Sequence, residues 1–202
     1  VSTVPGVVFE ADANYSYYSY PYYLVPNLQP HSITQPLLNT QGSVLLPEAQ
    51  GLQIAQSLPE NTTVTSLLTT SDTAYSKTGA WPLETNDKED GDIDGPFTLA
   101  VAIEQKISDT ESTRIFWVSS IQLLSSEINT AISGGNLDML MNAVNWASSH
   151  TERISIRAKN QQARYLTINS SSATAMTVLV VGVIPLCFLV AGIYIFIRRK
   201  RQ

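Results

Sequence analysis

The chain has 202 residues, a formal net charge of −5 and a single cysteine, and its length suits one domain with an additional segment. Seventeen acidic but only eight basic residues precede position 173, and this acidic balance excludes a nucleic-acid-binding surface, which needs clustered Lys and Arg. Because Cys187 stands alone, an intrachain disulfide framework and a thiolate metal site are excluded as well.

Residues 1–41 are rich in tyrosine and proline. Val4–Glu10 is a candidate strand, and the prolines predict an extended course without a helix between Val25 and Leu37. We expect an extended aromatic arm, the end of a truncated upstream region, whose rings cover the parent domain. The alternative is a binding arm, because tyrosine rings give contact area at a low entropy cost. The candidate binding residues are Tyr15, Tyr17, Tyr18, Tyr20, Tyr22 and Tyr23.

Residues 42–169 alternate between strand and helix patterns. The most regular strand patterns are Phe97–Ile107 and Thr113–Ser119, which are rich in apolar and β-branched residues. Further strands are predicted at 42–47, 63–70, 154–157 and 164–169, and a helix at 121–132. This succession predicts an extracytoplasmic α/β domain in which a mixed sheet is flanked by helices.

A second helix is predicted over Leu137–Ser149. Asn136 is its expected N-cap, and Asp138 favours its first turn. Apolar residues at helical spacing make it amphipathic, with one apolar stripe. The stripe consists of Leu137, Leu140, Met141, Val144 and Ala147.

Residues 170–172 are a serine hinge, and residues 173–197 are an uncharged apolar run. At about 1.5 Å per residue the run reaches roughly 37 Å, so it predicts one C-terminal transmembrane helix across a hydrocarbon core of about 30 Å. The alternative is a buried apolar hairpin broken at Pro185, but proline is tolerated in membrane helices.

The basic tail, residues 198–202, predicts a cell-membrane protein with a cytoplasmic C-terminus and its bulk outside the cytoplasm. Its charged residues are Arg198, Arg199, Lys200 and Arg201. An outer domain needs an export signal upstream, so we expect a C-terminal piece of a longer protein. Small residues and proline in the apolar run predict close packing against a partner helix. These are Gly182, Pro185, Ala191 and Gly192.

An acidic loop is predicted over Glu84–Asp94. Within it Asp90, Asp92 and Asp94 match the first half of a calcium loop. Val101 stands where the closing glutamate is required, so the alternative is a solvated loop without a cation.

Candidates for nucleophilic catalysis are few. His31 and His150 are the only histidines, no serine occurs in a GxSxG turn, and Cys187 lies in the apolar run. Ser71 and Asp72 follow a predicted strand, where an α/β active site would lie, but both residue types also form turns. The sequence therefore predicts no catalytic residue and no cofactor besides the calcium candidate.

The order of these segments resembles one protein family. In chain order they are HSITQPL, TSLLTTSDTAY, DGPFTLAVAIE, RIFWVSS, GGNLDMLMNAVNWASS and ISIRAK, then an apolar helix with a central proline, then RRKR. From about Gly6 onward, the chain resembles the C-terminal portion of the GldG-like proteins, auxiliary membrane proteins of ABC-type transport systems. The resemblance implies Rossmann-like or glutamine-amidotransferase-like layering between two membrane helices, no catalytic residues, and an ABC-2-type permease and its ATPase as partners.

We therefore expect a non-enzymatic, membrane-anchored accessory subunit of an ABC-type transporter, whose outer domain binds substrate or the permease and whose helix contacts membrane lipid. One alternative is a stand-alone cell-surface binding protein that uses the tyrosine-rich arm. Another is a degenerate hydrolase.

Overall fold

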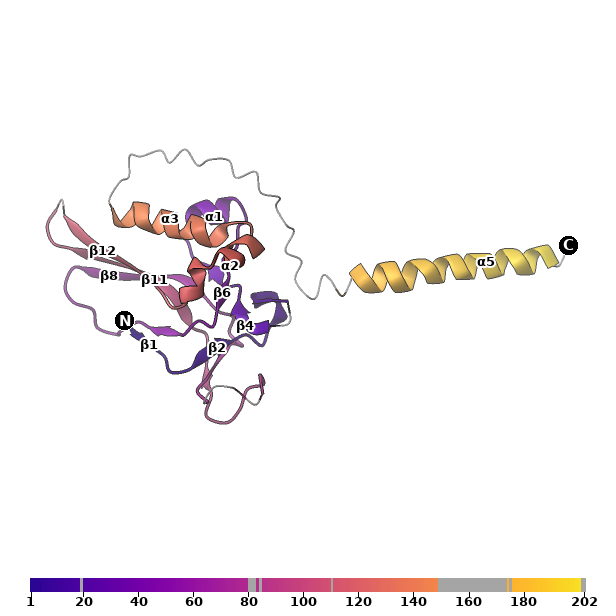
Figure 1. Cartoon of the computed structure of the whole chain (residues 1–202), viewed down its shortest axis with the longest axis horizontal. Coiled ribbons are helices and arrows are strands. Elements are labelled where there is room, and N and C mark those ends of the chain that lie inside the picture. Colours follow the sequence, from indigo (N-terminus) through magenta and orange to yellow (C-terminus); the bar gives the residue numbers. More distant parts are fainter. Residues whose placement is uncertain are drawn as a thin grey trace. The chain divides into compact units, whose positions relative to one another are not determined.

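The computed structural model describes residues 1–148 except 19, 80–82, 84 and 110, together with residues 174 and 176–200 (Figure 1). The chain forms two units, Val1–Thr167 and Ile168–Gln202. The strands predicted at 154–157 and 164–169, the hinge at 170–172 and His150 lie outside the described residues.

The main sheet of the first unit is built around strand β11, Thr98–Lys106. β11 pairs on one side with β8, Thr62–Thr69, and on the other with β12, Ser112–Val118. All three confirm strands predicted from their apolar and β-branched residues. Three short strands complete the sheet: β1 (Ser2–Thr3), β5 (Asn27–Leu28) and β7 (Leu52–Gln53).

Two smaller sheets of three strands each complete the β structure. The first has the order β10-β9-β2 and the second β3-β4-β6. Their strands are β2 (Val7–Phe9), β3 (Ser16–Tyr17), β4 (Tyr20–Leu24), β6 (Leu46–Pro47), β9 (Tyr75–Lys77) and β10 (Ile93–Asp94).

The fold contains both helices and sheets, as predicted, but every strand pairing among the described residues is antiparallel. A mixed sheet with parallel pairs was expected. The spacing of β11 and β12 gives the reason, because only five residues separate them in the sequence, whereas parallel strands require a crossover of about a dozen or more.

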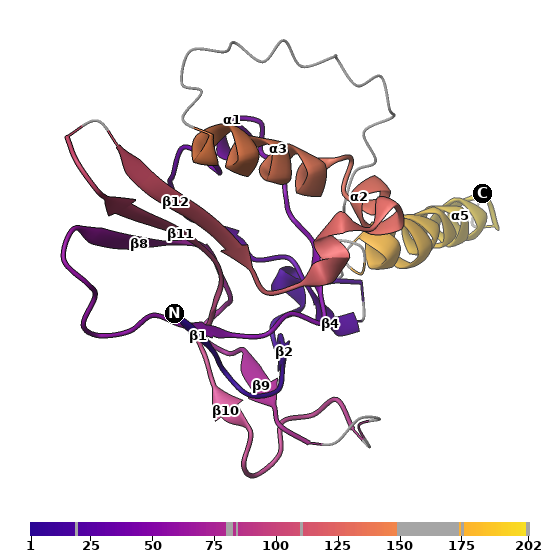
Figure 2. The same ribbon diagram turned by 60° about the vertical axis from the view of Figure 1, so that its left-hand side comes forward.

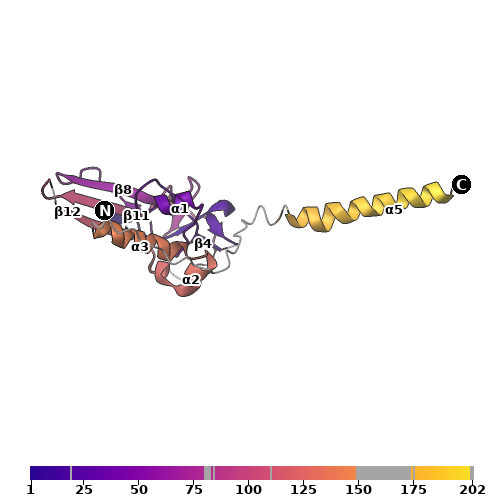
Figure 3. The same cartoon turned by 90° about the horizontal axis from the view of Figure 1, so that it is seen from above.

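Two of the helices, α1 (Gln35–Asn39) and α3 (Gly135–Ala147), lie on the same face of β8, β11 and β12 (Figures 2 and 3). The prediction of no helix before Leu37 was wrong, because Pro36 occupies the first turn of α1, where its missing N–H is not needed. The helix predicted at 121–132 is divided at Ser125. The pieces are η2 (Ile121–Leu124) and α2 (Ser126–Ala131), and a further short helix, η1, covers Ala13–Tyr15.

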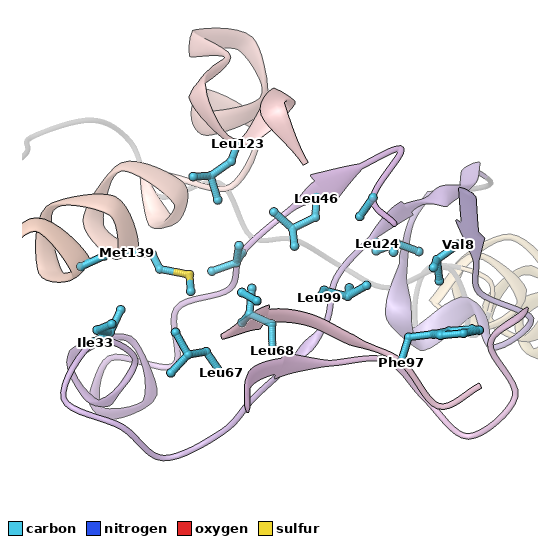
Figure 4. Close-up of a cluster of buried hydrophobic side chains, with 14 of the residues drawn as sticks. Val8, Leu24, Ile33, Leu46, Leu67, Leu68, Phe97, Leu99, Leu123 and Met139 are labelled. Carbon is cyan, nitrogen blue, oxygen red and sulfur yellow. The ribbon is translucent and has the colours of Figure 1, made fainter. Parts of the chain in front are cut away.

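The hydrophobic core lies between these helices and the strands β8 and β11 (Figure 4). Residues of the predicted arm belong to it: Val8, Leu24, Ile33 and Leu37 are buried and pack in the same cluster as Leu68 and Leu99. Residues 1–41 thus pack as part of the domain. The segment has only a few large aliphatic residues among many tyrosines and prolines, so its composition did not predict that it contributes to the core.

The orientation of α3 differs from the predicted one. The helix buries Met139 and Ala143, whereas Leu137, Met141 and Val144 of the predicted stripe are exposed. Its start fixes this rotation. Gly134, just before the helix, has a positive φ of 93°. A Cβ on Gly135 would lie 2.0 Å from the Ser43 carbonyl oxygen, so the first turn of the helix packs directly on the backbone at Ser43.

The described part of the second unit is helical. A π-helix, η3 (Val178–Val183), leads directly into α5 (Ile184–Lys200). Pro185 has no N–H to give to the residue four positions earlier, which accounts for the wider turns just before it. No helix in the described part of the chain combines the length and the apolar character needed to span a membrane.

Candidate functional site

Five of the six tyrosines named from the sequence lie on η1, β3 and β4, and Tyr18 lies in the turn directly after β3, so the fold brings all six together on one hairpin. Tyr22 packs on Phe9 with ring centroids 5.6 Å apart, which anchors the hairpin to the domain. Tyr18 and Tyr20 are the most exposed, at 65% and 52%. Five of the rings contact another tyrosine: Tyr17 with Tyr18, and Tyr20, Tyr22 and Tyr23 with one another. The hairpin therefore combines internal packing with an exposed aromatic surface.

The acidic loop is organised around Lys77, whose side chain is only 1% exposed. Its ammonium donates to the Asp87 carbonyl oxygen at 2.5 Å, to Glu89 Oε2 at 2.9 Å and to Asp92 Oδ2 at 3.3 Å. The Asp92 carboxylate also accepts the backbone N–H groups of Glu89 and Thr78. Lys77 thus supplies the positive charge around which the loop folds.

The surroundings of Lys77 and Asp92 favour the charged forms of both side chains. Burial alone would lower the pKa of Lys77, but hydrogen bonds and charge attraction from Glu89 and Asp92 outweigh it and raise that pKa. Burial would likewise raise the pKa of Asp92, but the Glu89 and Thr78 N–H groups and Lys77 outweigh it and lower that pKa. The pair therefore stays ionised at neutral pH.

The three predicted calcium ligands have different surroundings. Asp92 binds Lys77, Asp94 binds Lys88 at 2.5 Å, and Asp90 is exposed. Within the described ranges no three His, Cys, Asp or Glu side chains gather as a metal site would require. Calcium binding stays a prediction from the sequence.

Ser71 is tied to a buried carboxylate. Glu10, directly after β2, accepts the Ser71 backbone N–H at 2.9 Å and the Ser71 hydroxyl at 2.7 Å. Burial raises the pKa of Glu10, against the lowering effect of these hydrogen bonds. The Ser71 hydroxyl also lies 3.0 Å from that of Thr73. These contacts hold the turn after β8, and among the described residues none of them provides Ser71 with a histidine base.

His31 belongs to a packed cluster at the end of α3. Its ring meets Trp146 edge to face, with centroids 5.3 Å apart. Arg114 of β12 lies over the same indole at 5.5 Å, donates to the Trp146 carbonyl oxygen at 2.9 Å and binds Glu104 at 2.8 Å. Burial lowers the pKa of His31, while the charge of Glu104 raises it in part. This cluster joins α3 to the β11–β12 hairpin.

The residues predicted to pack within a membrane lie along η3 and α5. A Cβ added to Gly182 or to Gly192 would meet no atom within 4 Å, so both positions present open backbone. Pro185 lies in the first turn of α5, and Ala191 lies in its middle. Arg198 and Arg199 are exposed, Lys200 ends the helix, and Arg201 lies outside the described residues.

Sequence reasoning missed a groove beside β12. Its volume is about 410 Å³, and none of its eleven lining residues is charged. Phe116 and Val118 contribute one side, Leu123 and Leu124 of η2 another, and Leu140 of α3 a third. The sequence held one relevant signal: β12 is apolar on both faces, which is typical of a central strand, yet among the described residues it pairs with β11 alone.

Comparison of the chain with protein-family models, with curated proteins and with solved structures finds no match. The likeness to the GldG-like proteins stays a prediction.

Proposed function

We propose that this protein is a non-enzymatic, membrane-anchored accessory subunit of an ABC-type, ABC-2-like transporter. Its first unit would bind substrate or the permease outside the cytoplasm, and the apolar C-terminal run would lie in the membrane as a single helix. One observation carries this proposal: between Met176 and Ile193 the second unit exposes most of its described large apolar side chains. They include Val178, Leu179, Val181, Leu186, Phe188, Leu189 and Ile193.

Such exposure favours an apolar surrounding for the unit. Soluble proteins rarely expose contiguous apolar surface of this extent, and lipid or neighbouring helices are the surroundings that remove it from water. Arg198 and Arg199 follow the apolar positions and suit the cytoplasmic headgroup region, where basic residues are retained. The orientation proposed from the sequence follows, with the acidic domain on the outer side.

The open backbone at Gly182 and Gly192 supports a helix that meets another helix rather than lipid alone. Small residues let two helix backbones approach closely, and close packing drives helix association in membranes. A permease provides such helices, and its ATPase would be an indirect partner.

The proposal of a non-enzymatic role rests on how the described polar groups are used. Ser71, Glu10 and His31 all make contacts that join structural elements, and Ser71 and His31 lie in separate clusters. The first unit would act by binding.

The exposed rings of Tyr18 and Tyr20 favour a second candidate, a cell-surface binding protein that uses the tyrosine hairpin. Aromatic faces with hydroxyl tips suit ligands that have both apolar and polar groups, such as glycans. Replacing both residues with serine would abolish ligand capture in this case, but would leave a transporter assembly intact.

Co-purification separates the two candidates. The natural protein, tagged at its C-terminus, would be extracted from its host membranes in mild detergent and its partners identified by mass spectrometry. An ABC permease and an ATPase should accompany it, and Gly192→Leu should reduce their yield more than Asn145→Leu at an exposed position of α3. If neither subunit accompanies the unaltered protein, the transport proposal fails.

A further inference from the structure

The side of β12 that faces away from β11, its free side, has backbone hydrogen-bonding groups that no described residue uses. At the two ends of the β11–β12 hairpin, Ser119 N–H donates to the Leu99 carbonyl oxygen and Ile107 N–H donates to that of Glu111, at 3.0 and 2.9 Å. Because alternate residues of an antiparallel strand face the partner, the odd-numbered residues of β12 bind β11. The N–H and C=O groups of Phe116 and Val118 therefore point away from β11, and no described residue pairs with them.

The neutral groove described above runs along this free side. Its lining comes from β12, η2 and α3, together with Thr3 of β1 and Gln50, so a ligand that reaches the backbone of Phe116 and Val118 also meets Leu123, Leu124 and Leu140. An unpaired strand beside a helix and an apolar groove is the arrangement by which proteins bind an extended peptide as an added strand. Buried backbone groups of such a peptide would be satisfied by those of β12.

The other face of the sheet is also apolar at this strand. Val64 of β8, Ile103 of β11 and Ile115 of β12 are neighbours in register, and Ile115 is half exposed. An added strand would place alternate side chains beside Ile115, on the face of this row. Its other side chains would enter the groove on the opposite face. The strand that fits is therefore apolar on both faces, as central strands are.

We propose that the free side of β12 is a binding site for an extended strand of a partner, with an uncharged β-branched centre and basic flanking residues. Acidic residues at the two ends of the site favour basic flanking residues in the partner strand. Glu48 binds Gln122 of η2 at one end, and at the other Asp109 and Glu111 outnumber Lys106. This inference goes beyond the proposed function and stands on the sheet alone.

A second copy of the chain is the competing occupant of this site. In a β12–β12 pair about a twofold axis, the α3 helices of both copies would lie on the same face of the joined sheet, because α3 packs on β12. A single strand brings no second helix to that face.

The test uses the full chain in mild detergent and a fluorescent peptide, Lys-Lys-Val-Ile-Val-Ile-Val-Lys-Lys. Binding is followed by anisotropy, and hydrogen exchange reports the amides of Phe116 and Val118. We expect saturable binding, slowing of exchange at both amides by at least about tenfold, and binding at least about tenfold weaker when alternate peptide nitrogens are methylated, because two or more hydrogen bonds are lost. Replacing the flanking lysines with glutamate should also weaken binding.

Protein variants test the groove itself. Leu124→Lys changes an exposed wall residue and should weaken peptide binding about tenfold, whereas Val144→Lys, on an exposed part of α3 outside the groove, should change it less than about twofold. The proposal is overturned by a lack of saturable binding, by equal binding of the methylated peptide, or by unchanged exchange at Phe116 and Val118. A dimer that protects these amides without peptide would also overturn it.

Discussion

The side chain of Asn136 satisfies both backbone groups of Leu45, a residue 91 positions earlier in the chain. Its Oδ1 accepts the Leu45 N–H and its Nδ2 donates to the Leu45 carbonyl oxygen, both at 2.9 Å, and both residues are fully buried. Asn136 was predicted to be the N-cap of α3, but Gly134 holds that position. The asparagine instead joins α3 to the segment that enters β6.

Asn136→Ala should therefore destabilise the protein strongly. The substitution leaves a buried N–H and a buried C=O without partners, which together cost about 3 kcal/mol of unfolding free energy. Urea denaturation followed by tryptophan fluorescence measures the loss. The control is Asn145→Ala, at an exposed position of the same helix, and a similar loss in both variants would show that the Leu45 contact is not the cause.

The rotation of α3 predicts opposite effects for two methionines. Met139→Gln places an unpartnered amide in the core and should cost about 3 kcal/mol of unfolding free energy. Met141→Gln changes an exposed side chain and should stay within about 0.5 kcal/mol. Equal losses in denaturation experiments would instead support the stripe predicted from the sequence, in which Met141 is buried.

The sequence predicted β8, β11 and β12 well because each is a long run of β-branched and apolar residues that pack in one sheet. The predicted buried face of α3 was wrong, because contacts with distant parts of the chain decide which face is buried. The helical spacing around Met141 was correct, but the choice of buried face depended on Gly135 approaching Ser43 and on Asn136 binding Leu45, and sequence periodicity contains neither contact.

Lys77→Met should destabilise the first unit, because it leaves the Asp92 carboxylate, 5% exposed, without its cation. Removing one partner of a buried pair costs about 3 kcal/mol or more. Lys88→Met is the matched control, since Lys88 and Asp94 are largely exposed and their pair should contribute less than about 1 kcal/mol. Losses of the same size in both variants would contradict the central role of Lys77.

The lowered pKa of Asp92 predicts a dependence of stability on pH. A carboxyl whose pKa is lower in the folded state stabilises the fold above its unfolded pKa of about 3.9, and this contribution disappears as the pH falls through the folded pKa. The difference in unfolding free energy between the unaltered protein and Asp92→Asn should be about 2 kcal/mol at pH 7 and should shrink below about pH 4.

Glu10 has the opposite effect on stability, because folding raises its pKa. Its contribution to the stability of the fold is present at low pH and is lost as the pH rises. Glu10 is present in both proteins and cancels from the difference. A difference that stays constant from pH 7 to pH 3 would contradict the Asp92 assignment.

The candidate surfaces were only partly predictable. The tyrosine cluster was evident because its members are adjacent in sequence, and the fold keeps them on one hairpin. The groove was not, because its walls come from β12, η2 and α3, and because a strand that is apolar on both faces gives no indication that one side is unpaired. Lys77 was missed since a lone lysine in a strand carries no pattern.

Photo-crosslinking from the C-terminal helix tests the proposed function most directly. Phe188 is 74% exposed, so replacing it with benzoylphenylalanine preserves an aromatic ring and places a reactive group on the surface of α5. In native membranes, ultraviolet light should yield a covalent adduct between position 188 and an ABC permease. The same substitution at Tyr20 should yield no adduct with the membrane helices of that permease. Adducts at Phe188 that contain lipid or unrelated protein but no permease would contradict the account.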